Sequence, residues 1–158
     1  MNTPSQIAKQ FRDVLFGGNW TSVNMKETLA DISWQQANTK FYSFNTIAIL
    51  VYHMNYYVGV ISKVLQGQPL DGKDKDSFVC PPIESAEGWE KLVQKTWNEA
   101  ETFANLIEQL PDSKLEEIFI NEKYGNYYRN LHGVIEHYHY HLGQIVLIKK
   151  IINSSPAG

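Results

Sequence analysis

The sequence contains only one cysteine, Cys80, so it cannot form an intramolecular disulfide. This is typical of proteins in a reducing cytosol, and we expect a cytoplasmic location. Positive charge is also scarce, because 14 Lys and Arg stand against 17 Asp and Glu, for a formal net charge of −3. A surface that binds nucleic acid needs an excess of basic residues, and no run of Lys or Arg supplies one. We therefore expect no nucleic-acid partner.

Long uninterrupted apolar runs are absent. The longest apolar stretch, residues 47–61, is broken by His53, Asn55 and several tyrosines, so a membrane span is not expected. The first residues, MNTPSQIAKQFRDV, have no apolar core of the signal-peptide kind. What is abundant is material for a core: 43% of the 158 residues are hydrophobic and 13% are aromatic. These proportions predict one globular domain of ordinary size.

Apolar residues recur at helical spacing along nearly the whole chain, and no alternating strand pattern occurs, so we predict an all-α fold. Thr3 and Pro4 are expected to cap and open the first helix, and Gly67 to end the second in a left-handed conformation. A loop with a short helix and a later short helical turn are expected in the connections. The predicted single domain covers residues 1–153, followed by a disordered tail at 154–158. The four long helices are predicted at Thr3 to about Gly17, Asn45 to Gln66, Ser85 to Leu110 and Asn126 to Asn153.

The segment 68–84 is predicted to be a long loop, because it holds three of the six prolines, a glycine and a charged cluster. Seventeen extended residues reach on the order of 50 Å, more than the roughly 33 Å length of a 22-residue helix. The loop can therefore return the chain to the far end of the preceding helix. Four long helices with one long crossover between the second and third favour a four-helix bundle.

Four of the five histidines lie within residues 132–141. At about 100° per residue, His137 and His141 share one face of the last helix, beside its apolar stripe. His132 and His139 fall roughly 140–160° away, among charged residues. The fifth, His53, lies on the apolar face of the second long helix, at a depth comparable to that of His141. In an antiparallel pair of helices, His53, His137 and His141 can therefore meet.

Three imidazoles from two helices form a set that can hold Zn, Ni, Cu or Fe(II) and leave positions open for water or substrate. Spacing alone leaves an alternative equally open, namely three buried histidines satisfied by hydrogen bonds. A HEXXH zinc peptidase is excluded, because Tyr138 stands where its glutamate would be. A di-iron bundle needs two ExxH motifs, and Glu136 to His139 is a single one.

The segment HGVIEHYHYHLGQIVLIKK, with HxxxH followed by GQI, resembles the DinB/YfiT-like family of bacterial metalloenzymes. The resemblance extends over most of the chain, through GNWTSVNMKETLADIS, SFNTIAILVYHMNYYVGVISKVLQGQPL and SAEGWEKLVQKTWNEAETF. It implies an up-down-down-up four-helix bundle, frequently a homodimer. It also implies one divalent metal ion per chain, nickel or zinc, held by His53, His137 and His141. Characterised relatives include thiol-dependent S-transferases and an isomerase, and many members have no known reaction.

The group that reacts at such a centre would be a thiol or a water bound by the metal. Hydrolysis usually needs a nearby general base, and none is visible beside the three histidines. Glu136 points about 100° away from His137, and Asn55 and Tyr56 are at best polar neighbours of His53. This favours an enzyme that transfers a low-molecular-weight thiol to a small-molecule substrate. A metal-dependent small-molecule hydrolase and a non-catalytic metal-binding stress-response protein remain alternatives.

Several further residues are candidates for the surroundings of the site. Gln144 shares the face of His137, so it is expected to be either a supporting amide or a substrate contact. Segment 18–44 offers carboxylates and aromatic rings that a bundle can bring near the site, each with packing as the alternative role. These residues are Glu27, Asp31, Trp20 and Trp34.

Overall fold

The computed structural model describes residues 1–154, and the predicted all-α class is confirmed. Within these residues there are seven α-helices and two 3-10 helices, no strand, and one isolated bridge between Ile118 and Asn126. The α-helices are α1 (Thr3–Phe16), α2 (Met25–Leu29), α3 (Trp34–Asn38), α4 (Ile47–Leu65), α5 (Asp74–Ser77), α6 (Ala86–Glu108) and α7 (Tyr127–Ser154), and the 3-10 helices are η1 (Asp112–Glu116) and η2 (Glu122–Tyr124).

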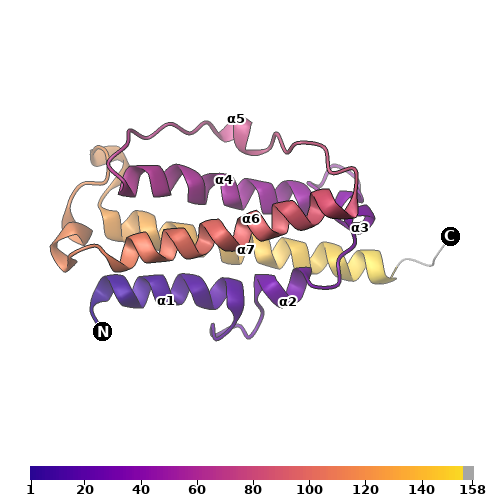
Figure 1. Ribbon diagram of the computed structural model, residues 1–158, viewed down its shortest axis with the longest axis horizontal. Helices are drawn as coiled ribbons and strands as arrows, with labels where there is room; N and C mark the ends of the chain where they lie inside the picture. Colours follow the sequence, from indigo (N-terminus) through magenta and orange to yellow (C-terminus); the bar gives the residue numbers. More distant parts are fainter. Residues whose placement is uncertain (155–158) are drawn as a thin grey trace.

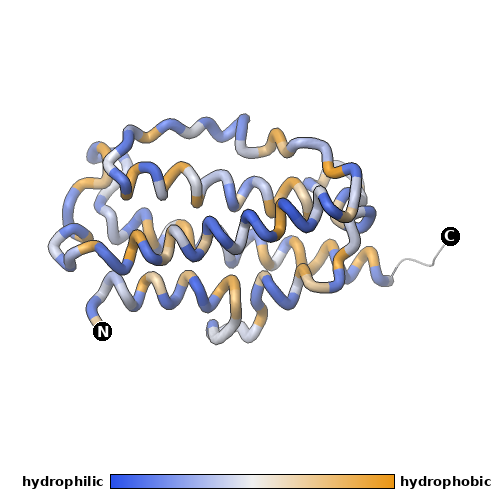
Figure 2. Tube along the Cα trace, in the orientation of Figure 1, coloured by the Kyte–Doolittle hydropathy of each residue, from blue (hydrophilic) through white to orange (hydrophobic). Residues whose placement is uncertain are grey.

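The four long helices α1, α4, α6 and α7 lie side by side and enclose the core (Figure 1). Helix α6 packs against α1 and α4, and α7 packs against the same two helices. Phe11 of α1 packs against both α6 and α7. Its ring makes edge-on contacts with Phe103 of α6, at 5.0 Å between ring centroids, and with Tyr138 of α7, at 5.2 Å. Hydrophobic and hydrophilic residues alternate along each long helix with helical spacing (Figure 2). Burying the apolar stripes holds the helices together.

The helix ends follow from local chemistry. Ser85 caps α6, because its side chain accepts a hydrogen bond from Gly88 N. Gly67 has φ +82°, and Gln68 N donates to Lys63 O at 2.9 Å, which completes the expected left-handed end of α4. The prediction for α1 is wrong by one residue. Its cap is Asn2 rather than Thr3, since the Asn2 side chain reaches Ser5 N while Thr3 is already helical.

The predicted loop 68–84 is wrong in its middle, where Asp74–Ser77 forms the short helix α5. The segment passes along α4 (Figure 1) and is largely hydrophilic (Figure 2). Two tyrosines of α4 fasten it: Tyr57 donates to Asp74 Oδ1 at 2.8 Å, and Tyr56 accepts from Lys73 N at 2.8 Å. A segment with little apolar surface is therefore held against the helix that carries His53.

Smaller differences concern the connections. The short helix expected after α1 is α2, whereas α3 was not predicted; Ser33 and Gln36 stabilise it as a capping box. The single turn expected before α7 is two 3-10 helices. Ser154, predicted to open the disordered tail, is the last residue of α7, and residues 155–158 lie outside the described part.

Helix α4 is long and apolar enough to cross a membrane by length and composition. In the fold, 61% of the most apolar window is buried inside the molecule. The core helix of a soluble protein has the same properties, so this single helix is weak support for a membrane span.

Candidate metal centre

The three histidine rings predicted to meet do lie together. His53 of α4 is 4% exposed and His141 of α7 is 7% exposed, while His137 is half-buried. The potential ligand atoms of the three lie within 4.8 Å of one another. The ring centroid of His53 is 4.8 Å from those of His137 and His141, and the centroids of His137 and His141 are 4.5 Å apart. The helical spacing of His137 and His141 thus places both rings opposite one residue of α4.

The other two histidines lie apart from this cluster. His132 packs against the ring of Tyr128 at 4.4 Å. His139 lines a different cavity, together with Val23 and Gly143. Both are half-buried rather than fully solvent-facing. Their separation from the three clustered rings agrees with the angular positions expected around the helix.

Ser77 of α5 sets the protonation of His53. The Ser77 hydroxyl donates to Asp74 O at 2.6 Å and lies 2.8 Å from His53 Nδ1. Because its only proton is committed to the carbonyl, Ser77 must accept from His53, so Nδ1 carries the ring proton. His53 Nε2 is then left with a lone pair that faces the other two histidines. The sequence analysis missed Ser77, since nothing in a polar loop marks one serine as a partner of a distant imidazole.

Gln144 sets the position of the ring proton in His141, as Ser77 does in His53. Its Oε1 lies 2.6 Å from His141 Nδ1. A carbonyl oxygen can only accept, so His141 Nδ1–H donates and His141 Nε2 keeps its lone pair. Of the two roles considered for Gln144, the supporting amide is the one that this hydrogen bond fits. Histidines that bind metals almost always have such a partner on the other ring nitrogen.

Burial keeps the three imidazoles neutral. Burial, and after it the charges of neighbouring histidines, lower the pKa of both His53 and His137 to about 4. Burial also lowers the pKa of His141, although the hydrogen bond to Gln144 opposes this. Neutral imidazole is the form that ligates metals, so the cluster is in its binding form at neutral pH.

Aromatic rings surround His53. Phe78, which follows α5, stacks on it at 4.0 Å and 16° between the ring planes. Tyr57 approaches His53 edge-on at 5.2 Å and His137 at 5.3 Å. Burial, and then the hydrogen bond to Asp74, raise the pKa of Tyr57 to about 12, so it remains a donor at neutral pH. These contacts of Phe78 and Tyr57 hold the imidazoles in place.

A cavity of about 460 Å³ opens beside His53 and His137. Its wall includes Asp74, which means that a carboxylate does reach the site, contrary to the sequence analysis. Asp74 comes from the crossover and not from helix α4 or segment 18–44, which is why helical geometry did not reveal it. Glu136, judged to point away, also lines this cavity. The cavity is lined by His53, Tyr57, Asp74, Arg129, Asn130, Gly133, Val134, Glu136 and His137.

The donor set fits a divalent metal ion. His53 Nε2 and His137 Nε2 are 2.9 Å apart, joined by a single proton. A shift of that proton to His137 Nδ1 frees both lone pairs. Nitrogens bound to one ion at about 2.0–2.1 Å lie about 3 Å apart when they are adjacent ligands. The wider pairs, within 4.8 Å, need a small inward rotation of a ring.

The remaining candidates lie away from this cavity. Trp20 is 99% exposed in the connection between α1 and α2. Asn55 is buried, two residues and about 200° around α4 from His53, and its Oδ1 has no hydrogen-bond partner among residues 1–154. Cys80 donates to Pro81 O, and burial raises the pKa of its thiol, which does not suit a nucleophile.

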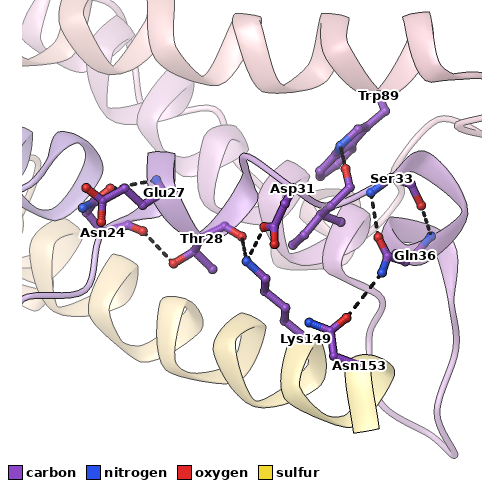
Figure 3. Close-up of polar contacts among 10 residues, drawn as sticks. Asn24, Glu27, Thr28, Asp31, Ser33, Gln36, Trp89, Lys149 and Asn153 are labelled. Carbon is purple, nitrogen blue, oxygen red and sulfur yellow. Dashed lines mark hydrogen bonds and ion pairs between the residues drawn. The ribbon is translucent and has the colours of Figure 1, made fainter. Parts of the chain in front are cut away.

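Of the two carboxylates named in segment 18–44, Asp31 links the residues after α2 to α7 (Figure 3). Asp31 forms an ion pair with Lys149, which also donates to Thr28 O at 2.9 Å. Glu27 belongs to the first turn of α2, where its backbone N donates to Asn24. Trp34 packs against the core. None of these residues lines the cavity beside the histidines.

Comparison with known proteins gives one result. The profile of a family described as "Protein of unknown function (DUF1572)" matches residues 19–156, which is most of the chain. No curated protein and no solved structure matches the sequence. The match includes all of α2 to α7 and therefore every residue of the histidine cluster and its cavity. The chain belongs to the DUF1572 family.

Proposed function

We propose that His53, His137 and His141 hold one divalent metal ion, nickel or zinc, and that the protein is a metal-dependent enzyme acting on a small molecule. The observation that carries this is the joint arrangement of three neutral imidazoles, each of the two buried rings having its Nδ1 engaged by a hydrogen-bond acceptor. The open cavity beside them supports an enzyme over a purely metal-storing protein, since a storage site needs no room for substrate.

The reaction we favour is transfer of a thiol to an electrophilic carbon. A divalent ion bound here lowers the pKa of a thiol that it binds. Tyr57 holds Oδ1 of Asp74, and Oδ2 of Asp74 has no hydrogen bond within residues 1–154, so it is free to accept the thiol proton. The sulfur lone pair then forms the new C–S bond while the leaving group departs with its electron pair.

Hydrolysis is the second candidate, and Asp74 is the observation that favours it. A carboxylate beside the histidines supplies the general base that water attack requires. The two reactions are separated by incubating the metal-loaded protein with 1-chloro-2,4-dinitrobenzene and 2-mercaptoethanol, or with 4-nitrophenyl acetate alone. Mass spectrometry shows a thioether in the first case and acetate release in the second. Thioether formation faster with loaded protein than in the spontaneous reaction, and no faster with metal-free protein, supports thiol transfer.

The metal proposal is tested by elemental analysis of purified variants. Replacing any one of His53, His137 or His141 with Ala should reduce the metal content per chain to a small fraction of that of the parent protein. The matched controls are His132→Ala and His139→Ala, which remove the same ring from the same helix outside the cluster. Full metal retention in the cluster variants, or equal loss in the controls, would refute the assignment of ligands.

We also propose that the chain is a DinB-like up-down-down-up bundle. The DUF1572 family is DinB-like, which supports this assignment. A further argument is the connection between α4 and α6, which passes along α4 so that both helices run in the same direction (Figure 1).

A homodimer is part of the same proposal. Its support is the exposure of Tyr140 and Leu147, about two turns apart on the outer side of α7, and light scattering of the purified protein tests it.

A further inference from the structure

One of the two arginines of the chain has no carboxylate partner among the residues that the structure describes. Arg12 is engaged by Glu101 at 2.9 Å and by Glu108 at 2.6 Å. Arg129, in contrast, forms no ion pair within residues 1–154, and it lines the same cavity as His53 and His137. A guanidinium in a cavity wall with unused donors is a typical recognition group for a carboxylate.

The side chain of Arg129 is exposed and makes one hydrogen bond to the backbone before α7. Arg129 Nη1 donates to Tyr124 O at 2.9 Å, which leaves Nε and Nη2 without a hydrogen bond in the described chain. Gly125 has φ +73°, and a Cβ there would lie 3.0 Å from Arg129 Cδ. The glycine thus allows the arginine to lie across the turn before α7. The hydrogen bond to Tyr124 O restricts the side chain in part, and the two remaining donor groups are available to an anion.

One cavity borders both Arg129 and two of the histidines, His53 and His137. Arg129, Gly133 and His137 are spaced by four residues, so they follow one face of α7, over a length of about 12 Å. Gly133 lies midway, and a Cβ at this position would have no atom within 4 Å. All three residues line the cavity. The space between the arginine and the imidazoles therefore suits an extended ligand rather than a compact one.

We propose that Arg129 binds a terminal carboxylate of an elongated substrate whose other end reaches the three histidines. This inference rests on the proposed function, because the reacting end needs the metal. Asp74 and Glu136 also line the cavity and oppose an anion there. A divalent ion on three neutral imidazoles offsets their charge, and Arg129 then makes the cavity favourable to one negative group.

The test uses metal chelators of defined length on the zinc-loaded protein, with binding measured by isothermal titration calorimetry. Suberic acid monohydroxamate carries a metal-binding hydroxamate at one end and a carboxylate at the other, and its terminal primary amide is the neutral counterpart. We expect the acid to bind at least about tenfold more tightly than the amide. Succinic acid monohydroxamate, which is too short to span the path, should show no such preference over its amide.

Arg129→Gln should abolish the preference for the acid while leaving zinc content and the affinity for the amide unchanged. The matched control is Lys123→Gln, which removes one positive charge from η2, just before α7, and lies outside the cavity. Equal affinity for acid and amide in the parent protein, or a preference that survives in Arg129→Gln, would overturn this inference alone. A protein that takes up no zinc, or a loaded protein that binds neither hydroxamate, would refute the proposed function and this inference with it.

Discussion

Replacing Ser77 with Ala tests the claim that the crossover helix prepares His53 for a metal. Ser77 is fully buried, and its hydroxyl joins His53 Nδ1 at 2.8 Å to Asp74 O at 2.6 Å. The substitution removes one oxygen and leaves the Nδ1–H of a buried ring without an acceptor. Hydrogen-bond partners of metal-binding histidines typically contribute 10- to 100-fold in affinity. We expect the Kd for zinc to rise by about that factor.

The same substitution should also destabilise the metal-free protein. A buried donor left unsatisfied costs about 1–3 kcal/mol. In a chain of this size each kcal/mol corresponds to a fall of about 2–4 °C in Tm. Zinc affinity is measured by competition with a chromophoric chelator, and Tm by circular dichroism.

Thr96→Val is the control for this experiment. Thr96 is also fully buried, and its hydroxyl donates to Leu92 O at 2.9 Å within α6, away from the cluster. It should change stability slightly and zinc affinity not at all. If Ser77→Ala binds zinc as tightly as the parent protein, within about twofold, the proposed role of Ser77 in setting the His53 tautomer is wrong.

Two further predictions concern buried polar groups. The unfolding free energy of the metal-free protein should fall as the pH drops from about 6.5 to about 4, since over this range the unfolded chain binds protons that His53 and His137, with pKa values lowered to about 4, do not. Each histidine contributes on the order of 3 kcal/mol or less, and urea unfolding at several pH values measures the sum; a flat profile would contradict it. Tyr138→Phe should leave stability unchanged or raise it by about 1 kcal/mol, because the buried Tyr138 hydroxyl has no partner within residues 1–154. A loss of more than 1 kcal/mol in chemical denaturation would reveal a partner for that hydroxyl.

Helical periodicity explains why much of this arrangement follows from sequence. Apolar stripes fix which face of a helix is buried, so the inward direction of His53, His137 and His141 and the separation of His132 and His139 were predictable. The depth of each residue along its helix, combined with an antiparallel pairing, was enough to bring the three rings together. Gln144 was predictable as a neighbour for the same reason, since it lies one turn from His141.

The contributions of the crossover were not predictable in this way. Asp74, Ser77 and Phe78 lie in a polar segment without periodicity, and their position depends on tertiary contacts with Tyr56 and Tyr57. Charged and polar loops are usually solvated, so sequence gives no reason to fold this one onto a helix. The cap of α1 shows a local version of the same limit, because Asn2 and Thr3 are both acceptable caps and side-chain reach decides between them.

The docking of α5 on α4 also has a thermodynamic consequence. Ser77 and Phe78 contact His53 only while the crossover lies against α4, and an ion on His53 favours that same position. By reciprocity, binding of an ion at His53 and docking of the crossover on α4 strengthen each other by an equal free energy. Limited proteolysis would report this coupling, as cleavage within residues 68–84 should slow when zinc is added. The polar segment 68–84 would then report whether the centre is filled.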